Sequence, residues 1–152
     1  MTSKDDTVLE RERLSGYEQA LNESNIKLDE SLIKYGGTTY EAGYESMKEL
    51  LEEGIVPQAA FVTGDEAAIG AINAACDKGY KVPEDISVAG FNDVKIAKMY
   101  RPKLTTVYQP LYDMGAVAIR MVIKLINKEQ LESKKIELPY KIIERESVIP
   151  RK

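Results

Sequence analysis

Acidic side chains follow two of the apolar runs that the sequence predicts to be strands. Asp65 and Glu66 follow the run 58–63 after a single glycine, Gly64, and Asp93 comes shortly after the run 86–89. Paired carboxylates can act as general acid and general base. Acids at a helix N-terminus are also stabilised by capping and by the helix dipole. The sequence leaves both interpretations open.

A glycine-rich turn, Gly36-Gly37-Thr38-Thr39, precedes another predicted helix. Backbone N–H groups at a helix N-terminus can hold an anion. The segment lacks the Gly-Lys-Ser/Thr ending of a phosphate-binding P-loop. A plain turn followed by a threonine cap also explains it.

The histidine and cysteine content limits the chemistry. The chain has no histidine, which excludes catalytic triads with a histidine base, histidine metal sites and imidazole acid–base catalysis. Its single cysteine, Cys76, allows no intramolecular disulfide, and a reducing compartment fits best. Cys76 shares a predicted helical face with Ala68, Ile69 and Ile72, so we expect a small buried side chain rather than a nucleophile. We expect no catalytic residue, no metal and no cofactor.

One predicted helix, 111–127, carries a charged stripe. Asp113, Val117, Arg120 and Lys124 recur at helical spacing and share one face. An acid near the start and bases near the end complement the helix dipole, as a solvated face would. Two bases one turn apart also suit a phosphate group. A second stripe is apolar and is predicted to face the core; its members are Met114, Ala118, Met121 and Leu125.

The elements that must position these residues alternate along the chain. Apolar residues at helical spacing predict helices over 9–24, 40–53, 66–78, 94–100 and 111–127. Short apolar runs predict strands over 32–35, 58–63, 86–89 and 104–107, and a bent or edge strand over 136–138 and 141–143. This alternation indicates an α/β fold with a largely parallel sheet. Ligands of such sheets bind at the carboxyl ends of the strands, so segments 36–38, 64–65 and 92–93 are expected on one rim.

Length and composition narrow the class of protein. With 152 residues, 43% hydrophobic and 30% charged, the chain predicts one compact domain. A net charge of −4 argues against a nucleic-acid-binding surface within the chain. No apolar run approaches the roughly 18 residues of a membrane span, and the charged segment 1–13 differs from a signal peptide. We therefore expect a cytoplasmic protein with no membrane partner.

Four segments occur in an order that resembles the LacI/GalR (lactose-repressor) family of bacterial transcription regulators. They are Arg13-Leu14-Ser15-Gly16-Tyr17, Gly64-Asp65-Glu66-Ala67-Ala68-Ile69-Gly70, Val82-Pro83-Glu84-Asp85-Ile86-Ser87-Val88-Ala89-Gly90-Phe91 and Arg101-Pro102-Lys103-Leu104-Thr105-Thr106-Val107. The resemblance covers about residues 11–147 and concerns the effector-binding core of the family.

The resemblance implies a fold and a domain organisation. It implies an α/β, periplasmic-binding-protein-like (type I) core of two lobes. Residues 1–107 and 135–152 would form a parallel-sheet C-terminal lobe, and residues 108–134 would supply a helix of the N-terminal lobe. The DNA-binding headpiece is expected to be absent from this chain, so DNA would be bound only through that headpiece. The resemblance also implies a homodimer without catalytic activity.

The resemblance further implies a small-molecule site. Arg13 matches an arginine that commonly bonds effector hydroxyl or carboxyl groups. Thr38 and Gly64 replace an aromatic and a polar residue of sugar-responsive members, and Asn92 replaces an aspartate. With Asp65 beside them, these residues form the candidate effector set. Because the stacking ring and the charged acceptor are missing, a sugar or sugar phosphate would bind weakly.

One branch of the family, the regulators of carbon catabolite repression, implies a protein partner. These regulators bind the serine-phosphorylated phosphocarrier protein HPr on a surface that includes the helix 111–127. Arg120 and Lys124 match the basic residues that receive the phosphoserine. The residues matched around them are Tyr112, Asp113 and Val117.

We therefore expect the core of a transcription regulator that is controlled by serine-phosphorylated HPr. A core governed mainly by a small sugar or sugar phosphate, through Arg13, Asn92 and Asp65, is the first alternative. A doubly wound enzyme that uses Asp65 and Asp93 is the second. It is disfavoured because the sequence has no nucleophile–base pair, phosphate loop or dinucleotide fingerprint.

Overall fold

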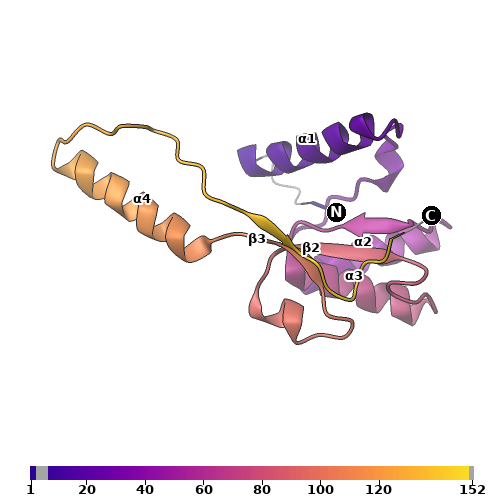
Figure 1. The fold of residues 1–152 in the computed structure, drawn as a ribbon. Helices are drawn as coiled ribbons and strands as arrows, with labels where there is room; N and C mark the ends of the chain where they lie inside the picture. Colours follow the sequence, from indigo (N-terminus) through magenta and orange to yellow (C-terminus); the bar gives the residue numbers. More distant parts are fainter. Residues whose placement is uncertain (3–6, 151–152) are drawn as a thin grey trace.

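The computed structural model describes residues 1–2 and 7–150. Helices and strands alternate along most of this length (Figure 1). The α-helices are α1 (Val8–Glu23), α2 (Tyr40–Glu52), α3 (Asp65–Asp77) and α4 (Leu111–Ile126). Two short 3-10 helices are η1 (Glu30–Leu32) and η2 (Lys95–Lys98).

The sheet has four strands in the spatial order β1, β2, β3, β4. They are β1 (Ala59–Phe61), β2 (Ser87–Asn92), β3 (Thr105–Tyr108) and β4 (Lys141–Ile143). The first three are parallel, and β4 pairs antiparallel with β3 at the edge. The predicted α/β class, the largely parallel sheet and the edge strand are confirmed.

The hydrophobic core lies between the sheet and the pair α2–α3. Met47, Ile72 and Leu104 are fully buried there. Glycines allow the two helices to approach closely, since a Cβ at Gly43 would overlap the backbone of Ala67 and one at Gly70 would overlap the carbonyl oxygen of Tyr40. Figure 1 shows α1 on the opposite side of the sheet from α2 and α3. The body therefore has helices on both faces of the sheet.

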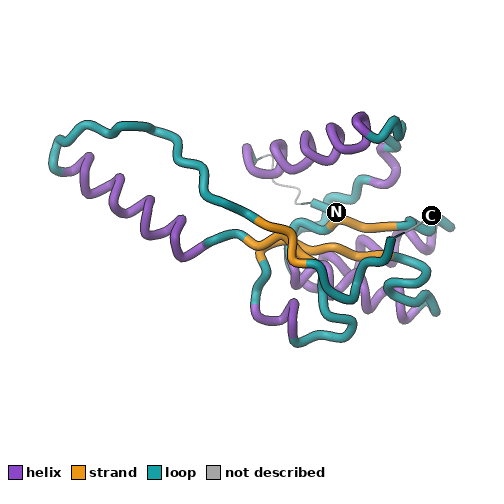
Figure 2. Tube along the Cα trace, in the orientation of Figure 1, coloured by secondary structure: helices purple, strands orange, loops and turns teal. Residues whose placement is uncertain are grey.

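Helix α4 extends away from this body (Figure 1). Figure 2 shows that a long loop joins its far end to β4. All of α4 lies within the described residues, and none of its side chains is buried. The prediction that Met114, Ala118, Met121 and Leu125 face a core is therefore wrong for this chain. Met114 is 45% and Leu125 59% exposed, because no other described segment covers that face.

Several short elements differ from their predictions. The run 32–35 forms no strand; Tyr35 makes only an isolated bridge with Thr2. Thr2 itself donates its backbone N–H to the carbonyl oxygen of Lys34 at 2.9 Å. The predicted helix 94–100 shortens to η2, and residues 136–138 are not a strand. Such short runs need a neighbouring partner to become regular, and periodicity does not supply one.

Cys76 is exposed, so the prediction of a buried cysteine is wrong. It lies near the end of α3, where residues 76–79 are exposed as a group. The apolar spacing of α3 is real, but its last turn extends beyond the packed part of the body. Among the described helices, none is long and apolar enough to cross a membrane.

Candidate functional site

The carboxyl ends of the parallel strands meet at one rim of the sheet, as predicted. Gly64 precedes α3 there, and a Cβ built on it would lie 3.2 Å from the Cβ of Thr38. Asp65 starts α3 and accepts a hydrogen bond from the backbone N–H of Val94, which follows the β2 turn. Thr38, the start of α3 and the turn after β2 are thus brought together, although the run 32–35 before Thr38 is not a strand.

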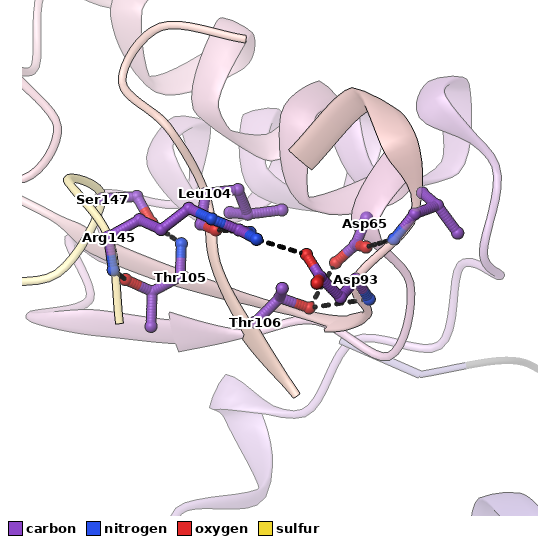
Figure 3. A network of polar contacts seen from close by, with 8 residues as sticks. Asp65, Asp93, Leu104, Thr105, Thr106, Arg145 and Ser147 are labelled. Atoms are coloured by element: carbon purple, nitrogen blue, oxygen red, sulfur yellow. Dashed lines mark hydrogen bonds and ion pairs between the residues drawn. The ribbon is translucent and has the colours of Figure 1, made fainter. Parts of the chain in front are cut away.

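Asp65 is enclosed by protein donors (Figure 3). Its Oδ1 accepts from Thr106 Oγ1 at 2.6 Å, and its Oδ2 accepts from the Val94 N–H at 2.7 Å. The side chain is only 2% exposed. Burial raises the pKa of Asp65, although its hydrogen bonds act in the opposite direction. This carboxyl group therefore fastens the start of α3 to β3 and to the turn after β2.

Asp93 forms an ion pair with Arg145 at the same rim. Arg145 Nη2 lies 2.5 Å from Asp93 Oδ1, and the two side chains are 12% and 13% exposed. Arg145 Nη1 also donates to the carbonyl oxygen of Leu104 at 2.7 Å, and its backbone N–H donates to Thr105 Oγ1 at 2.9 Å. One arginine after β4 therefore holds the end of β2 and the start of β3 (Figure 3). The sequence analysis missed Arg145, which is 52 residues from Asp93.

Asn92 and Asp93 form the turn that this network supports. Their φ angles are 101° and 52°, in the left-handed region. Asn and Asp tolerate this region better than most other side chains do. Asn92 is half-buried at the rim, and Thr38 is exposed.

The two aspartates of the enzyme alternative are both engaged by protein groups. Asp65 is bonded to Thr106, and Asp93 is paired with Arg145. Within residues 1–2 and 7–150, no three Asp, Glu, Cys or His side chains gather in a way that could hold a metal ion. The hydrogen bonds and the ion pair of these two aspartates connect α3, the turn after β2, β3 and the segment after β4.

Arg13 projects from α1 onto an aromatic side chain of the rim. Its guanidinium carbon lies 4.5 Å from the ring centroid of Phe91, which in turn meets Phe61 edge to face at 6.1 Å. Its Nη1 donates to Glu10 Oε1 at 2.9 Å and to the Thr63 carbonyl oxygen at 3.4 Å. The sequence analysis did not identify Phe91 or Glu10 as site residues. Phe91 directly precedes the Asn92–Asp93 turn, and this position was the sequence signal that could have identified it.

A groove of about 1240 Å³ lies between α1, the rim and α4. Arg13 and Phe91 line it from the body, and Val117 lines it from α4. Most of the other lining side chains are apolar, and the charged ones are Glu12, Lys134 and Lys135. The groove therefore contains one candidate effector residue, Arg13, and one residue of the candidate partner surface, Val117.

The remaining partner residues lie outside the groove, on the exposed side of α4. Tyr112 is 88% exposed, and Asp113, Arg120 and Lys124 are exposed as well. Large apolar side chains are also exposed along the helix: Leu111, Ile119, Val122, Ile123, Leu125 and Ile126. A helix that is apolar on most sides is typical of one covered from more than one direction.

Comparison with known proteins places this geometry in a family. Residues 1–148 match the periplasmic binding protein-like domain. Catabolite control protein A of Priestia megaterium is 44% identical over 135 residues, which are 89% of this chain and 41% of that protein. The chain thus spans less than half the length of that curated relative.

Two solved structures share the arrangement. The crystal structure of transcription regulator CcpA of Lactococcus lactis has a TM-score of 0.89 and 40% identity, over 97% of this chain and 54% of that chain. The complex of transcriptional regulator CelR with cellobiose has a TM-score of 0.91 and 33% identity, over 97% of this chain and 45% of that chain. The proteins in both of these structures are named as transcription regulators. The chain belongs to the periplasmic binding protein-like domain family, in the form that LacI-family transcription regulators such as catabolite control protein A contain.

Proposed function

We propose that this chain is part of the effector-binding core of a transcription regulator in carbon catabolite control, and that α4 receives serine-phosphorylated HPr. The observation that carries the proposal is the pair Arg120 and Lys124, both exposed and one turn apart on α4. The similarity to catabolite control protein A supports the same assignment.

The chemistry of a phosphoserine suits this pair. The group carries about −1.5 to −2 charges and three acceptor oxygens. A guanidinium presents a planar fork of donors, and an ammonium acts as a mobile point charge, so together they can meet several oxygens. Tyr112 and Val117 would contribute apolar contact around the phosphate, and Asp113 would sit at the opposite end of the stripe, where it favours partners that are basic there.

The same proposal includes the domain organisation. Residues 1–107 and 135–152 would form the C-terminal lobe, and residues 108–134 would belong to the N-terminal lobe. The exposure of α4 supports this division, since its apolar faces call for a cover that the described body does not provide. The regulator would act as a homodimer and bind DNA only through a headpiece outside this chain, in keeping with the net charge of −4.

A second candidate is a small sugar or sugar phosphate at the rim. The position of Arg13 on Phe91 at the edge of a large groove favours it, and the similar CelR structure contains cellobiose. Arg13, Thr38, Gly64 and Asn92 would line this site. Asp65 would act by holding the turn in place, because both of its oxygens already accept protein hydrogen bonds.

The decisive experiment is a double-mutant cycle between HPr phosphorylation and Arg120→Ala, measured by calorimetry in a complete regulator that contains this chain. Arg120→Ala should cost about 1.5 to 3 kcal/mol of binding free energy for the phosphorylated partner, and Lys124→Ala somewhat less. Binding of the unphosphorylated partner should be weak and unchanged by either variant. Affinity for the phosphorylated form should fall steeply with salt.

Arg101→Ala is the matched control, because Arg101 is also exposed but lies at the η2 side of the body. Its guanidinium donates only to nearby backbone carbonyls, those of Met99 and Tyr100, among the described residues. It should leave partner binding unchanged. A coupling energy near zero for Arg120, or an equal loss with Arg101→Ala, would remove the proposed partner.

A further inference from the structure

Helix α1 carries a carboxylate, Glu10, that forms an ion pair with the candidate effector residue Arg13. Glu10 Oε1 lies 2.9 Å from Arg13 Nη1, and the two side chains are only 11% and 12% exposed. The other oxygen of Glu10 accepts a hydrogen bond from the Thr2 hydroxyl. The positive charge of Arg13 is therefore balanced by a carboxylate of the chain itself, in surroundings largely shielded from water.

A small pocket of about 90 Å³ lies beside this ion pair, between α1 and β1. Arg13, Thr63, Tyr17 and Phe61 contribute to its lining. Two buried polar atoms of these residues, Arg13 Nε and Thr63 Oγ1, have no hydrogen-bond partner within the described part of the chain. Thr63 is only 3% exposed. Buried polar atoms of this kind favour a ligand group that can bond to them.

We propose that Glu10 makes this pocket selective for a neutral hydroxyl or amide group and excludes anions from Arg13. The proposal builds on the small-molecule role of the rim and names the ligand class. A neutral group that both accepts and donates can bond to Arg13 Nε and to Thr63 Oγ1. A second carboxylate or a phosphate would meet Glu10 as a like charge in a poorly solvated space, where such a pair is strongly disfavoured.

The dimensions of the pocket fit one functional group of a larger ligand. A volume of about 90 Å³ is too small for a whole sugar ring with its hydroxyl groups. Arg13, Tyr17 and Phe61 also line the adjoining groove of about 1240 Å³. A ligand in the groove could therefore extend a single hydroxyl or amide group into the pocket.

Met1 also lines the pocket, and its N-terminal amino group donates to the carbonyl oxygen of Phe61 at 2.9 Å. Burial lowers the pKa of this amino group to about 6, although the nearby Glu10 acts in the opposite direction, so the group is largely uncharged at pH 7.

The other charged side chains line the groove rather than the pocket. Glu12 lies on α1 two residues from Glu10, and Lys134 and Lys135 lie on the loop after α4. Lys135 pairs with Glu137 at 3.0 Å. Glu12 has the same charge as Glu10 but forms no hydrogen bond or ion pair with Arg13 in the described structure, so it provides a control for the general electrostatic field.

The test compares acetamide with acetate, which have the same shape and differ in charge. Each is titrated into the 152-residue chain while the Nε–Hε signal of Arg13 is followed by NMR. The unmodified chain should bind acetamide at least tenfold more tightly than acetate. Glu10→Gln should abolish or reverse that preference, and Glu12→Gln should leave it unchanged.

Thr63→Val supplies an independent check that needs no change at Glu10. It removes the hydroxyl at nearly constant volume and should weaken acetamide binding severalfold. Acetate binding as tight as that of acetamide in the unmodified chain would overturn the proposal, as would equal effects of Glu10→Gln and Glu12→Gln. Absence of any response at Arg13 to either compound would also overturn it. None of these measurements involves α4, so a failure of the HPr proposal would be seen separately.

Discussion

The body of the molecule and the α4 segment differ in how far the apolar faces of their helices are buried. Both contain amphipathic helices with long apolar faces. In the body, α2 and α3 cover each other and the sheet, and Met47 and Ile72 are fully buried. On α4, Ile126 is 72% exposed and no side chain in this fully described helix is buried. An apolar face thus predicts that a helix is covered, but it does not predict which part of the chain provides the cover.

The two candidate sites differ in the same way, because one is held by buried contacts and the other lies on an exposed helix. The rim is held by buried contacts, in which Asp65, Thr106 and the Asp93–Arg145 pair fix the turn at Asn92. The residues of the proposed partner surface are arranged by the helical geometry of α4 alone. The effector residues are therefore preorganised by tertiary structure, whereas Arg120 and Lys124 need only an intact helix.

The largest expected contrast comes from adding one methyl group to a glycine in each region. Gly43→Ala should reduce the free energy of unfolding by about 3 kcal/mol or more, because its Cβ would overlap the backbone of Ala67. Gly115→Ala on α4 should stabilise by up to about 1 kcal/mol, since nothing lies within 4 Å and alanine favours helix. Urea unfolding followed by circular dichroism measures both. Equal effects would mean that the two regions are packed alike.

Local sequence predicted the body well for a physical reason. The helix that became α3 has an acidic start and an apolar face, and the short run before it has the length of a buried strand; both features act within a few residues. The resemblance then predicted how these units assemble. The predictions that Cys76 and the apolar face of α4 are buried were wrong. Burial of a helix face depends on whether a distant segment of the chain packs against it, and the local sequence does not show this.

The site was predictable in position but not in its contacts. The carboxyl ends of the strands indicated segments 64–65 and 92–93, and the structure brings both to one rim. Arg145 supports that rim from 52 residues away, and no local spacing links it to Asp93. Such long-range pairs follow from the three-dimensional path of the chain.

A smaller contrast is expected between two ion pairs. Arg145→Ala should cost about 2 kcal/mol, because it leaves the largely buried Asp93 without its charged partner and frees the carbonyl oxygen of Leu104. Lys135→Ala should have no measurable effect, since Lys135 and Glu137 are 83% and 82% exposed. Both are measured by chemical denaturation in the same buffer. A loss with Lys135→Ala as large as that with Arg145→Ala would show that the loop after α4 is packed against something in solution.

The smallest effect on stability is expected on the outer side of α4. Ile123→Gln combined with Ile126→Gln should change the free energy of unfolding by less than about 0.5 kcal/mol, because the two side chains are 50% and 72% exposed and helix propensity changes little. The same double variant should weaken self-association, since exposed apolar patches of this kind favour contact between copies. Sedimentation velocity over a range of concentrations measures that change, with Arg101→Ala as an exposed control outside α4. A destabilisation of several kcal/mol in the monomer, comparable to a core substitution at Ile72, would instead mean that α4 folds back onto the body, and the contrast between the two regions would disappear.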